Sequence, residues 1–185
     1  MPLQPGFEKS KAASWKTHLS PKRPISAQRG VPGMRRRVLM RMVMPYWRLS
    51  RGMTLGVRGV ILREGREVLL IRHGYQPGWH FPGGGVEWRE TLLAALAREV
   101  EEESGVIVKG TPALHGLFAN FHISPSDHVA VFIIRDWEQH RVPAPTFEIQ
   151  EQRFFPLSAL PPDISRGTRR RVCEIFEGQP VGQHW

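Results

Sequence analysis

Four glutamates, Glu99 and Glu101 to Glu103, lie within five consecutive residues of a stretch that has helical periodicity. On a helix, Glu99, Glu102 and Glu103 share one flank because they are three or four positions apart. Glu101 points to the opposite side and to water. Like charges four residues apart repel at a cost of roughly 0.2–0.5 kcal/mol, which a bound cation would reverse. The cluster therefore indicates a site for a hard divalent ion, Mg²⁺ or Mn²⁺, although an ordinary solvated helix face is the alternative.

The helix that carries these glutamates is predicted to begin after Thr91, a suitable N-terminal cap, and to end at Gly105. Near a helix C-terminus the dipole also disfavours each anion, by roughly 0.3–1 kcal/mol. A charge pattern that opposes two local rules is typical of a functional site. The apolar stripe expected to face the core consists of Leu93, Leu96, Ala97 and Val100.

The residues around the helix follow a longer pattern, Gly84-x5-Glu90-x7-Arg98-Glu99-Val100-x-Glu102-Glu103-x-Gly105-Val106. A chance match to all of these positions in a chain of this length is well below ~1 in a million. The pattern resembles the Nudix box, and the preceding Trp79-His80-Phe81-Pro82-Gly83-Gly84 resembles the loop of Nudix hydrolases. The resemblance covers about Met53 to Gly178.

This resemblance implies an α/β fold, namely an α/β/α sandwich with a mixed sheet. It also implies a metal-dependent hydrolase that cleaves the pyrophosphate linkage of a nucleoside diphosphate joined to another moiety. By position, the residues that bind metal or activate water are Glu99, Glu102 and Glu103. Arg98 is expected to orient these carboxylates, and the backbone carbonyl of Gly83 to bind metal. Glu90 is expected to support the loop and the helix.

Further residues are expected to contact the substrate. Gly84 and Gly85 have no Cβ, so the backbone there can approach phosphate groups closely. Another carboxylate is expected from a loop in the sequence TFEIQEQRFFP, residues 146–156. Glu148 is preferred over Glu151, and a solvated loop carboxylate is the alternative for both.

Aromatic side chains offer a way to hold a nucleobase by stacking. Phe121 and Tyr75 are the candidates, although a phenylalanine in an apolar strand usually belongs to the core. Cys173 is expected to be a small buried hydrophobic residue. Four histidines are expected to be structural or to lie at the rim of the cleft: His73, His80, His122 and His128.

The elements that must position these residues can be predicted from periodicity. Strands and helices follow one another without regular βαβ alternation, which indicates a mixed-sheet α/β or α+β sandwich. A turn-like Glu64-Gly65-Arg66 predicts a hairpin. The predicted strands lie at 54–62, 67–73, 106–108, about 114–121 and 128–135, and a last helix lies at 167–176.

Composition limits the class of protein. A chain of 185 residues with 41% hydrophobic content fits one domain with an extension. The single cysteine cannot form an internal disulfide, which favours a reducing, cytoplasmic compartment. The sequence has no apolar run long enough to span a membrane and no apolar signal segment. It also has no cluster of Cys and His at metal-ligand spacing, so a zinc site is not expected.

The positive charge is concentrated in the first part of the chain. Residues 1–52 contain twelve Lys and Arg and a single acid, so residues 53–185 carry a net charge of −2 within a total of +9. We expect residues 1–33 to be disordered, residues 34–52 to form a short basic amphipathic segment, and residues 53–185 to form the hydrolase domain. Alternatives for the extension are an organellar targeting segment, an anion-binding arm and a start at Met34.

Two other functions are compatible with the sequence. The chain could be a non-catalytic Nudix-like module that binds nucleotides, although such a module would more naturally have lost one of the box glutamates. It could also be a hydrolase that associates with nucleic acid or with an anionic membrane through its basic extension. The substrate itself is not encoded in the motif.

Overall fold

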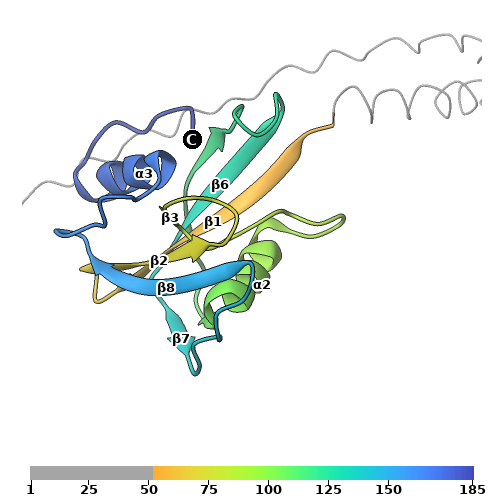
Figure 1. Ribbon diagram of the computed structural model, residues 1–185. Coiled ribbons are helices and arrows are strands. Elements are labelled where there is room, and N and C mark those ends of the chain that lie inside the picture. The colour runs from red at the N-terminus through yellow and green to blue at the C-terminus, as the bar shows by residue number, and fades with distance from the viewer. Residues whose placement is uncertain (1–51) are drawn as a thin grey trace, which may run out of the picture. The chain divides into compact units, whose positions relative to one another are not determined.

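The computed structural model of the protein describes residues 52–185. The predictions for residues 1–33 and 34–52 therefore fall outside the described residues, apart from Gly52. The described elements, shown in Figure 1, are β1 (Thr54–Arg63), β2 (Glu67–His73), β3 (Trp79–His80), α2 (Leu92–Ser104), β4 (Val106–Val108), β5 (Ala113–Ala119), β6 (Asp127–Ile134), β7 (Trp137–Gln139), β8 (Ile149–Pro156) and α3 (Arg166–Phe176).

The main sheet has the strand order β3-β2-β1-β6-β5, and β8 pairs with β2 along its other edge. Strands β1 and β6 are parallel, whereas β1 with β2, β5 with β6 and β2 with β8 are antiparallel. A separate two-stranded sheet is formed by β4 and β7. The sheet is therefore mixed, as predicted.

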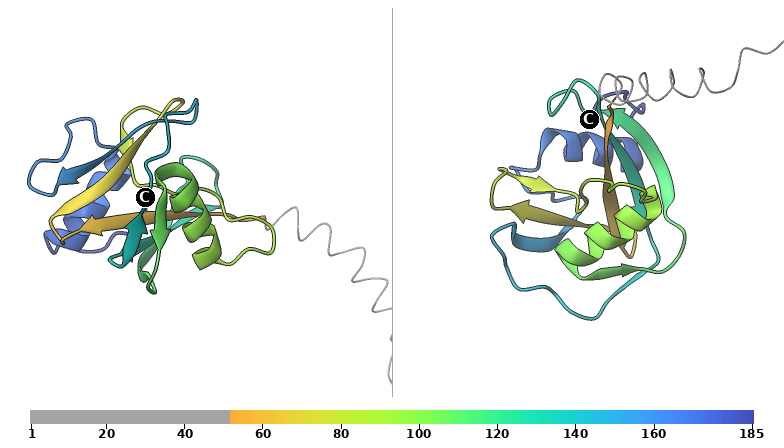
Figure 2. Two further views of the ribbon diagram at one scale, coloured as in Figure 1. Left: turned by 90° about the horizontal axis from the view of Figure 1, so that it is seen from below. Right: turned by 90° about the vertical axis from the view of Figure 1, so that its right-hand side faces the viewer.

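The two helices lie on opposite faces of the main sheet (Figures 1 and 2). One core packs beneath α2 and contains Leu96 and Val100, and the other packs beneath α3 and contains Val172. Strand β1 contributes to both cores, because successive side chains of a strand point to opposite faces. The arrangement is the α/β/α sandwich that the sequence led us to expect.

The glycine-rich segment lies in a gap between two strands. Strand β1 pairs with β2 only at its C-terminal end, and β2 then diverges. Segment 82–86 takes its place along β1: the N–H of Val57 donates to the Gly84 carbonyl at 2.9 Å, and the N–H of Gly59 donates to the Pro82 carbonyl at 2.8 Å. The edge of β1 thus fixes the backbone of this segment through main-chain hydrogen bonds.

Two predictions about individual elements are wrong. Residues 146–156 do not form only a loop, because Ile149–Pro156 form β8 and pair with β2 along its length. Leu93 is not part of the buried stripe and is 45% exposed. Leu92 and Ala95 pack against the α2 core instead, so the helix is rotated by about one position from the predicted orientation.

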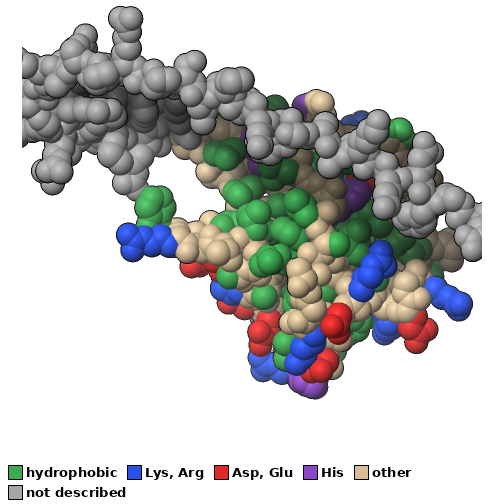
Figure 3. Space-filling model, turned by 180° about the vertical axis from the view of Figure 1, so that it is seen from behind, with side chains coloured by type: hydrophobic (Ala, Val, Ile, Leu, Met, Phe, Trp, Pro, Cys, Tyr) green, Lys and Arg blue, Asp and Glu red, His purple; other side chains and the backbone are tan. Residues whose placement is uncertain are grey.

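The surface of the described part is mixed in character. Seen from behind, hydrophobic side chains are exposed over the middle of the surface, and charged side chains gather toward its lower edge (Figure 3). Leu114 and Leu117 on the edge strand β5 are among the exposed large hydrophobic residues. Within residues 52–185, no helix combines the length and the apolar character needed to cross a membrane.

Candidate active site

Helix α2 begins and ends at the predicted residues. The Thr91 side chain accepts a hydrogen bond from the Ala94 N–H at 3.2 Å and caps the N-terminus. Gly105 ends the helix in the left-handed conformation, with φ of 71°. The helix is therefore fixed at both ends, with its glutamates in the last two turns.

Glu103 is the buried carboxylate of the cluster, with 8% of the residue exposed. Its Oε2 accepts a hydrogen bond of 2.6 Å from the N–H of Gly83, so the end of α2 is joined to the glycine-rich segment. The pKa of Glu103 is raised to about 7, mainly by burial and also by the negative charges of Glu99 and Glu148. The Gly83 N–H and the Arg58 charge act in the opposite direction.

Two glycines allow the backbone to pass close to its neighbours. Gly83 has φ of 136°, a conformation that other residues rarely adopt, and a Cβ there would collide with the Val57 carbonyl. A Cβ at Gly84 would overlap the carboxylate of Glu99. The segment therefore places bare backbone directly against the glutamates of α2.

Arg98 lies between the carboxylates of the helix and the loop that precedes it. It binds Glu90 through two hydrogen bonds of 2.9 Å and Glu99 through one of 2.7 Å. Its guanidinium also donates to the Gly85 carbonyl at 3.2 Å and lies 3.6 Å from Glu102. The paired arginine lowers the pKa of Glu90 to about 2. Arg98 thus contacts every carboxylate that it was expected to orient except Glu103.

Replacing Arg98 by lysine keeps the charge but removes the planar fork that binds several carboxylates at once. We expect Arg98→Lys to lower kcat more than it raises KM, because Glu99 and Glu102 lose a fixed orientation. Steady-state kinetics will measure both constants, with whichever substrate is turned over in the assay described under Proposed function. A rise in KM at unchanged kcat would instead assign Arg98 to substrate binding.

Arg58 belongs to the site but was not predicted from the sequence. Its guanidinium on β1 donates hydrogen bonds to the carbonyl of Gly83 and, at 3.4 Å, to that of Phe81. The signal that could have found it is an arginine inside an otherwise apolar strand, GVRGVIL. The same Gly83 carbonyl is the predicted metal ligand, so Arg58 supplies a positive charge at that position.

The two candidate carboxylates of the β8 region both lie near the end of α2. Glu148 precedes β8, where its carbonyl accepts a 2.9 Å hydrogen bond from the Gly74 N–H, and its charge contributes to the raised pKa of Glu103. Glu151 lies on β8 and lines a cavity of about 200 Å³ together with Glu102 and Glu103. The preference for Glu148 over Glu151 stays a prediction.

The rings of His73, Tyr75 and His80 lie close together near the end of β2, where β2 has diverged from β1. Tyr75 is 62% exposed, and its ring centroid lies 5.0 Å from that of His73. His73 and His80 are buried, and the pKa of His73 is lowered to about 4, mainly by burial and also by the charges of Arg58 and His80. His73 is therefore neutral at physiological pH.

Two further residues named from the sequence, Phe121 and Cys173, lie outside the cluster of α2 glutamates. Phe121 is 53% exposed, and its ring makes edge contacts with His128 and His184 at centroid distances of 5.9 and 5.7 Å. Its proposed stacking role stays a prediction. Burial and also the charge of Glu148 raise the pKa of the Tyr75 hydroxyl, so Tyr75 lies close to Glu148. Cys173 is half-buried on α3 rather than fully buried, so the prediction of a core cysteine is wrong.

The donor set of the cluster suits a hard divalent ion, because every side-chain donor is a carboxylate oxygen. In the part of the chain that the structure describes, no three Asp, Glu, His or Cys side chains converge closely enough to hold a metal. Glu99 is turned toward Arg98, and the Glu102 side chain is 63% exposed. A positive charge beside Glu103 would be favourable, because burial and the charges of Glu99 and Glu148 raise the pKa of this carboxyl, and the Arg58 charge lowers it.

The fold and the site define a known class of protein. A family model described as NUDIX domain matches residues 53–174, which is more than half of the chain. The chain belongs to the NUDIX domain family. The match begins at Met53, where the resemblance in the sequence also begins.

Individual relatives match parts of this domain. The chain is 39% identical over 67 residues to a MutT-like protein of Streptomyces ambofaciens, covering 36% of this chain and 43% of that protein. It is 35% identical over 95 residues to an RNA pyrophosphohydrolase of Coxiella burnetii, covering 51% and 34% of the two chains. It is 29% identical over 130 residues to an ADP-ribose pyrophosphatase of Methanocaldococcus jannaschii, covering 68% and 75%.

A solved structure agrees with this assignment. The crystal structure of a MutT NUDIX hydrolase from Burkholderia pseudomallei is similar with a TM-score of 0.58 and 27% identity, covering 66% of this chain and 98% of that one. The chain spans less than half of the length of the Streptomyces and Coxiella proteins that it matches.

Proposed function

We propose that this protein is a divalent-metal-dependent hydrolase that cleaves the pyrophosphate linkage of a nucleoside diphosphate joined to another moiety. One observation carries the proposal: a buried Glu103, bonded to the Gly83 N–H at 2.6 Å, lies on the same flank of α2 as two further glutamates and against a segment of bare backbone. The complete set of box carboxylates favours catalysis over binding alone.

The residues that would hold the metal are the three glutamates on one flank of α2 and the carbonyl of Gly83. Binding would require the Glu99 and Glu102 side chains to turn from Arg98 and from solvent toward Glu103, and Arg58 to release the Gly83 carbonyl. A divalent ion held there would neutralise charge on the phosphoryl oxygens and lower the pKa of a bound water. The ligands are Glu99, Glu102 and Glu103, and the proposed cofactor is Mg²⁺ or Mn²⁺.

The other residues position these groups and the substrate. Gly83 holds the Glu103 carboxylate through its N–H, and Arg98 holds Glu99 through a 2.7 Å hydrogen bond. Gly84 and Gly85 present backbone to the phosphates without an intervening side chain. Arg58 adds a positive charge beside them, which favours an anionic substrate.

The moiety beyond the phosphates is proposed to extend toward the β8 side of the site. Glu148 lies at that end, and the exposed ring of Tyr75 follows Gly74, whose N–H bonds the Glu148 carbonyl at 2.9 Å. An aromatic face in this position could stack a nucleobase. Phe121 is the second candidate for that role.

RNA is a second candidate substrate. Two observations favour it: a relative is named RNA pyrophosphohydrolase, and residues 1–52 of this chain carry twelve Lys and Arg. A basic segment would hold a polyanion by a salt-dependent interaction with its phosphates. The chemistry at the glutamates would be the same for RNA and for a small nucleotide.

The test is an assay of product release from nucleoside diphosphate conjugates, including ADP-ribose, and from RNA with a 5′-triphosphate, each with Mg²⁺ and with Mn²⁺. We expect turnover of at least one substrate, loss of turnover after chelation, and recovery when the ion is returned. Thermal stability should fall on chelation as well, because binding to the folded state stabilises it. Full turnover after exhaustive chelation would rule out the metal mechanism.

A further inference from the structure

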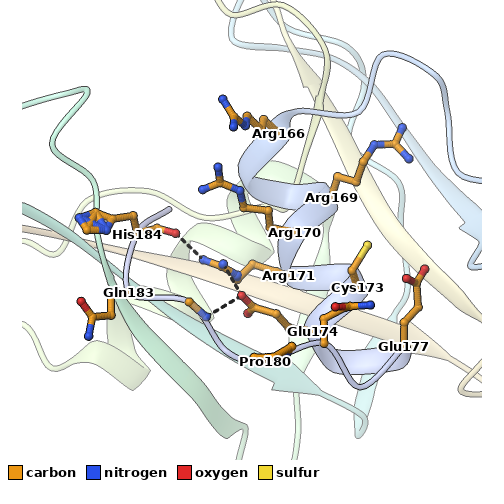
Figure 4. A pocket seen from close by; sticks show the side chains of 12 residues that line it. Arg166, Arg169, Arg170, Arg171, Cys173, Glu174, Glu177, Pro180, Gln183 and His184 are labelled. Atoms are coloured by element: carbon orange, nitrogen blue, oxygen red, sulfur yellow. Dashed lines mark hydrogen bonds and ion pairs between the residues drawn. The ribbon is translucent and has the colours of Figure 1, made fainter.

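A second cavity lies on the opposite side of the main sheet from the glutamates of α2. It has a volume of about 610 Å³ and is bounded by α3 and by the C-terminal residues 179–184 (Figure 4). Its lining contains no residue of α2 or of the glycine-rich segment. Because α2 and α3 cover opposite faces of the sheet, this cavity is separate from the candidate active site.

The C-terminal wall of the cavity is fixed by hydrogen bonds. Glu174 on α3 accepts a bond of 2.9 Å from the Gly182 N–H, and Arg171 donates to the His184 carbonyl at 3.2 Å. Strand β5 is bonded to the same segment, since the Ala119 N–H donates to the Gln183 carbonyl at 2.9 Å. The cavity is therefore part of the folded domain.

The lining of this cavity contains four arginines against two carboxylates, Glu174 and Glu177, and so has an excess of positive charge, whereas residues 53–185 as a whole have a net charge of −2. Arg171 is fully buried and its charge is neutralised by Glu174 at 2.6 Å. Arg169 and Arg170 donate to backbone oxygens at 3.3 and 3.2 Å, and within residues 52–185 neither they nor Arg166 form an ion pair. Three guanidinium groups thus line the cavity without a carboxylate partner in the described chain.

These arginines are placed where the helix itself disfavours them. Arg166 is the first residue of α3, and a cation at a helix N-terminus opposes the helix dipole. Arg166 and Arg170 are four positions apart and extend from the same side of α3 in Figure 4, so their charges repel one another. In addition, Nε of the buried Arg171 has no hydrogen-bond partner among the described residues. A bound anion would reverse the first two costs.

We propose that this cavity is a second binding site, for a phosphate-bearing ligand of nucleotide size. Guanidinium groups match phosphate oxygens in charge and in planar geometry. The volume of about 610 Å³ lies in the range of small-molecule sites. Arg166 and Arg170 contact the phosphates, and His184 lies at the edge of the same cavity. The phosphate groups can come from a free nucleotide or from a nucleic-acid backbone.

The test measures binding to the full chain by titration calorimetry. The chain carries Glu103→Gln, and chelator is present, so that the probe is not hydrolysed. The probes are ADP and a ribonucleotide decamer with a 5′-hydroxyl. The variants are Arg166→Gln, Arg170→Gln and Arg170→Lys, with Arg135→Gln as the matched control, because Arg135 is exposed and lies outside the cavity.

We expect Arg166→Gln and Arg170→Gln each to weaken binding of ADP at least tenfold, Arg170→Lys to weaken it less, and Arg135→Gln to leave it within twofold. The same losses for the decamer alone would identify a nucleic-acid backbone as the source of the phosphates. The proposal is overturned if both glutamine variants bind both probes as the Arg135→Gln control does. The α2 site is the same in all variants, so any binding of ADP there appears as a transition common to every titration, and only the transition that changes with Arg166 and Arg170 is assigned to this cavity. Thermal melting checks that each variant is folded.

Discussion

Replacing Glu103 by glutamine is expected to lower kcat by roughly 10²–10⁴-fold while leaving the fold intact. Glutamine keeps the size of the side chain, and its carbonyl oxygen can still accept the hydrogen bond from Gly83. It loses the negative charge that would hold a metal ion or accept a proton from water. The measurement is steady-state turnover of the substrate found in the assay above, with circular dichroism to verify folding.

The control for this variant is Glu101→Gln, which removes an equal charge from the exposed side of the same helix. Turnover of Glu101→Gln should stay within about twofold of the native enzyme, since surface substitutions away from a site have small effects. An equal loss of turnover at Glu101 and Glu103 would show that the flank of α2 assigned to catalysis is wrong.

The Glu103→Gln variant should be more stable than the native chain when metal is absent. Burial raises the pKa of Glu103 from 4.5 to about 7, so ionising it in the folded state costs roughly 3 kcal/mol. This cost is present above about pH 7 and disappears as the pH falls toward 4.5. We therefore expect Glu103→Gln to raise the free energy of unfolding at pH 8 in chelator and to match the native chain near pH 4.5. A constant difference across this pH range would contradict the buried carboxylate.

Replacing Gly83 by alanine is expected to destabilise the protein by at least about 3 kcal/mol. The alanine would have to adopt φ of 136° and place its Cβ against the carbonyl oxygen of Val57, which is fixed in β1. Because the obstacle is backbone in the central sheet, it cannot be relieved by turning a side chain. Chemical denaturation of the two proteins will measure the difference.

Two neighbouring glycines provide controls for this effect. Gly85→Ala should change stability little, since a Cβ there meets no atom within 4 Å. Gly84→Ala should affect activity more than stability, because its Cβ meets the movable carboxylate of Glu99. Equal destabilisation by all three substitutions would mean that the close approach at Gly83 is not what holds the segment.

The long, strongly patterned elements could be predicted from the sequence. Strands β1 and β2 and helix α2 begin and end within one or two residues of the expected positions, because their periodicity is continuous and their ends carry turn or cap residues. Strand β8 was missed because IQEQRFFP shows no regular alternation, and β3 because two residues carry no period. Both are defined by pairing with β2, which involves distant parts of the chain.

The site was predictable where it depends on local spacing along one helix. The contact between Arg98 and its neighbouring glutamates follows from positions one and four residues apart. The position of Arg58 beside the Gly83 carbonyl depends instead on the divergence of two strands, which no local pattern records. The partial burial of Leu92 in place of Leu93 reflects a small rotation of α2, which packing decides.

The gap between β1 and β2 also bears on how the protein avoids aggregation. Where β2 diverges, β1 would present unpaired N–H and C=O groups, and an exposed strand edge is a template for pairing with another chain. Segment 82–86 covers this edge with the bonds from Val57 and Gly59. A substitution that displaces the segment would expose the unpaired edge of β1 in the middle of the sheet. Such variants should therefore aggregate even where the two cores stay packed.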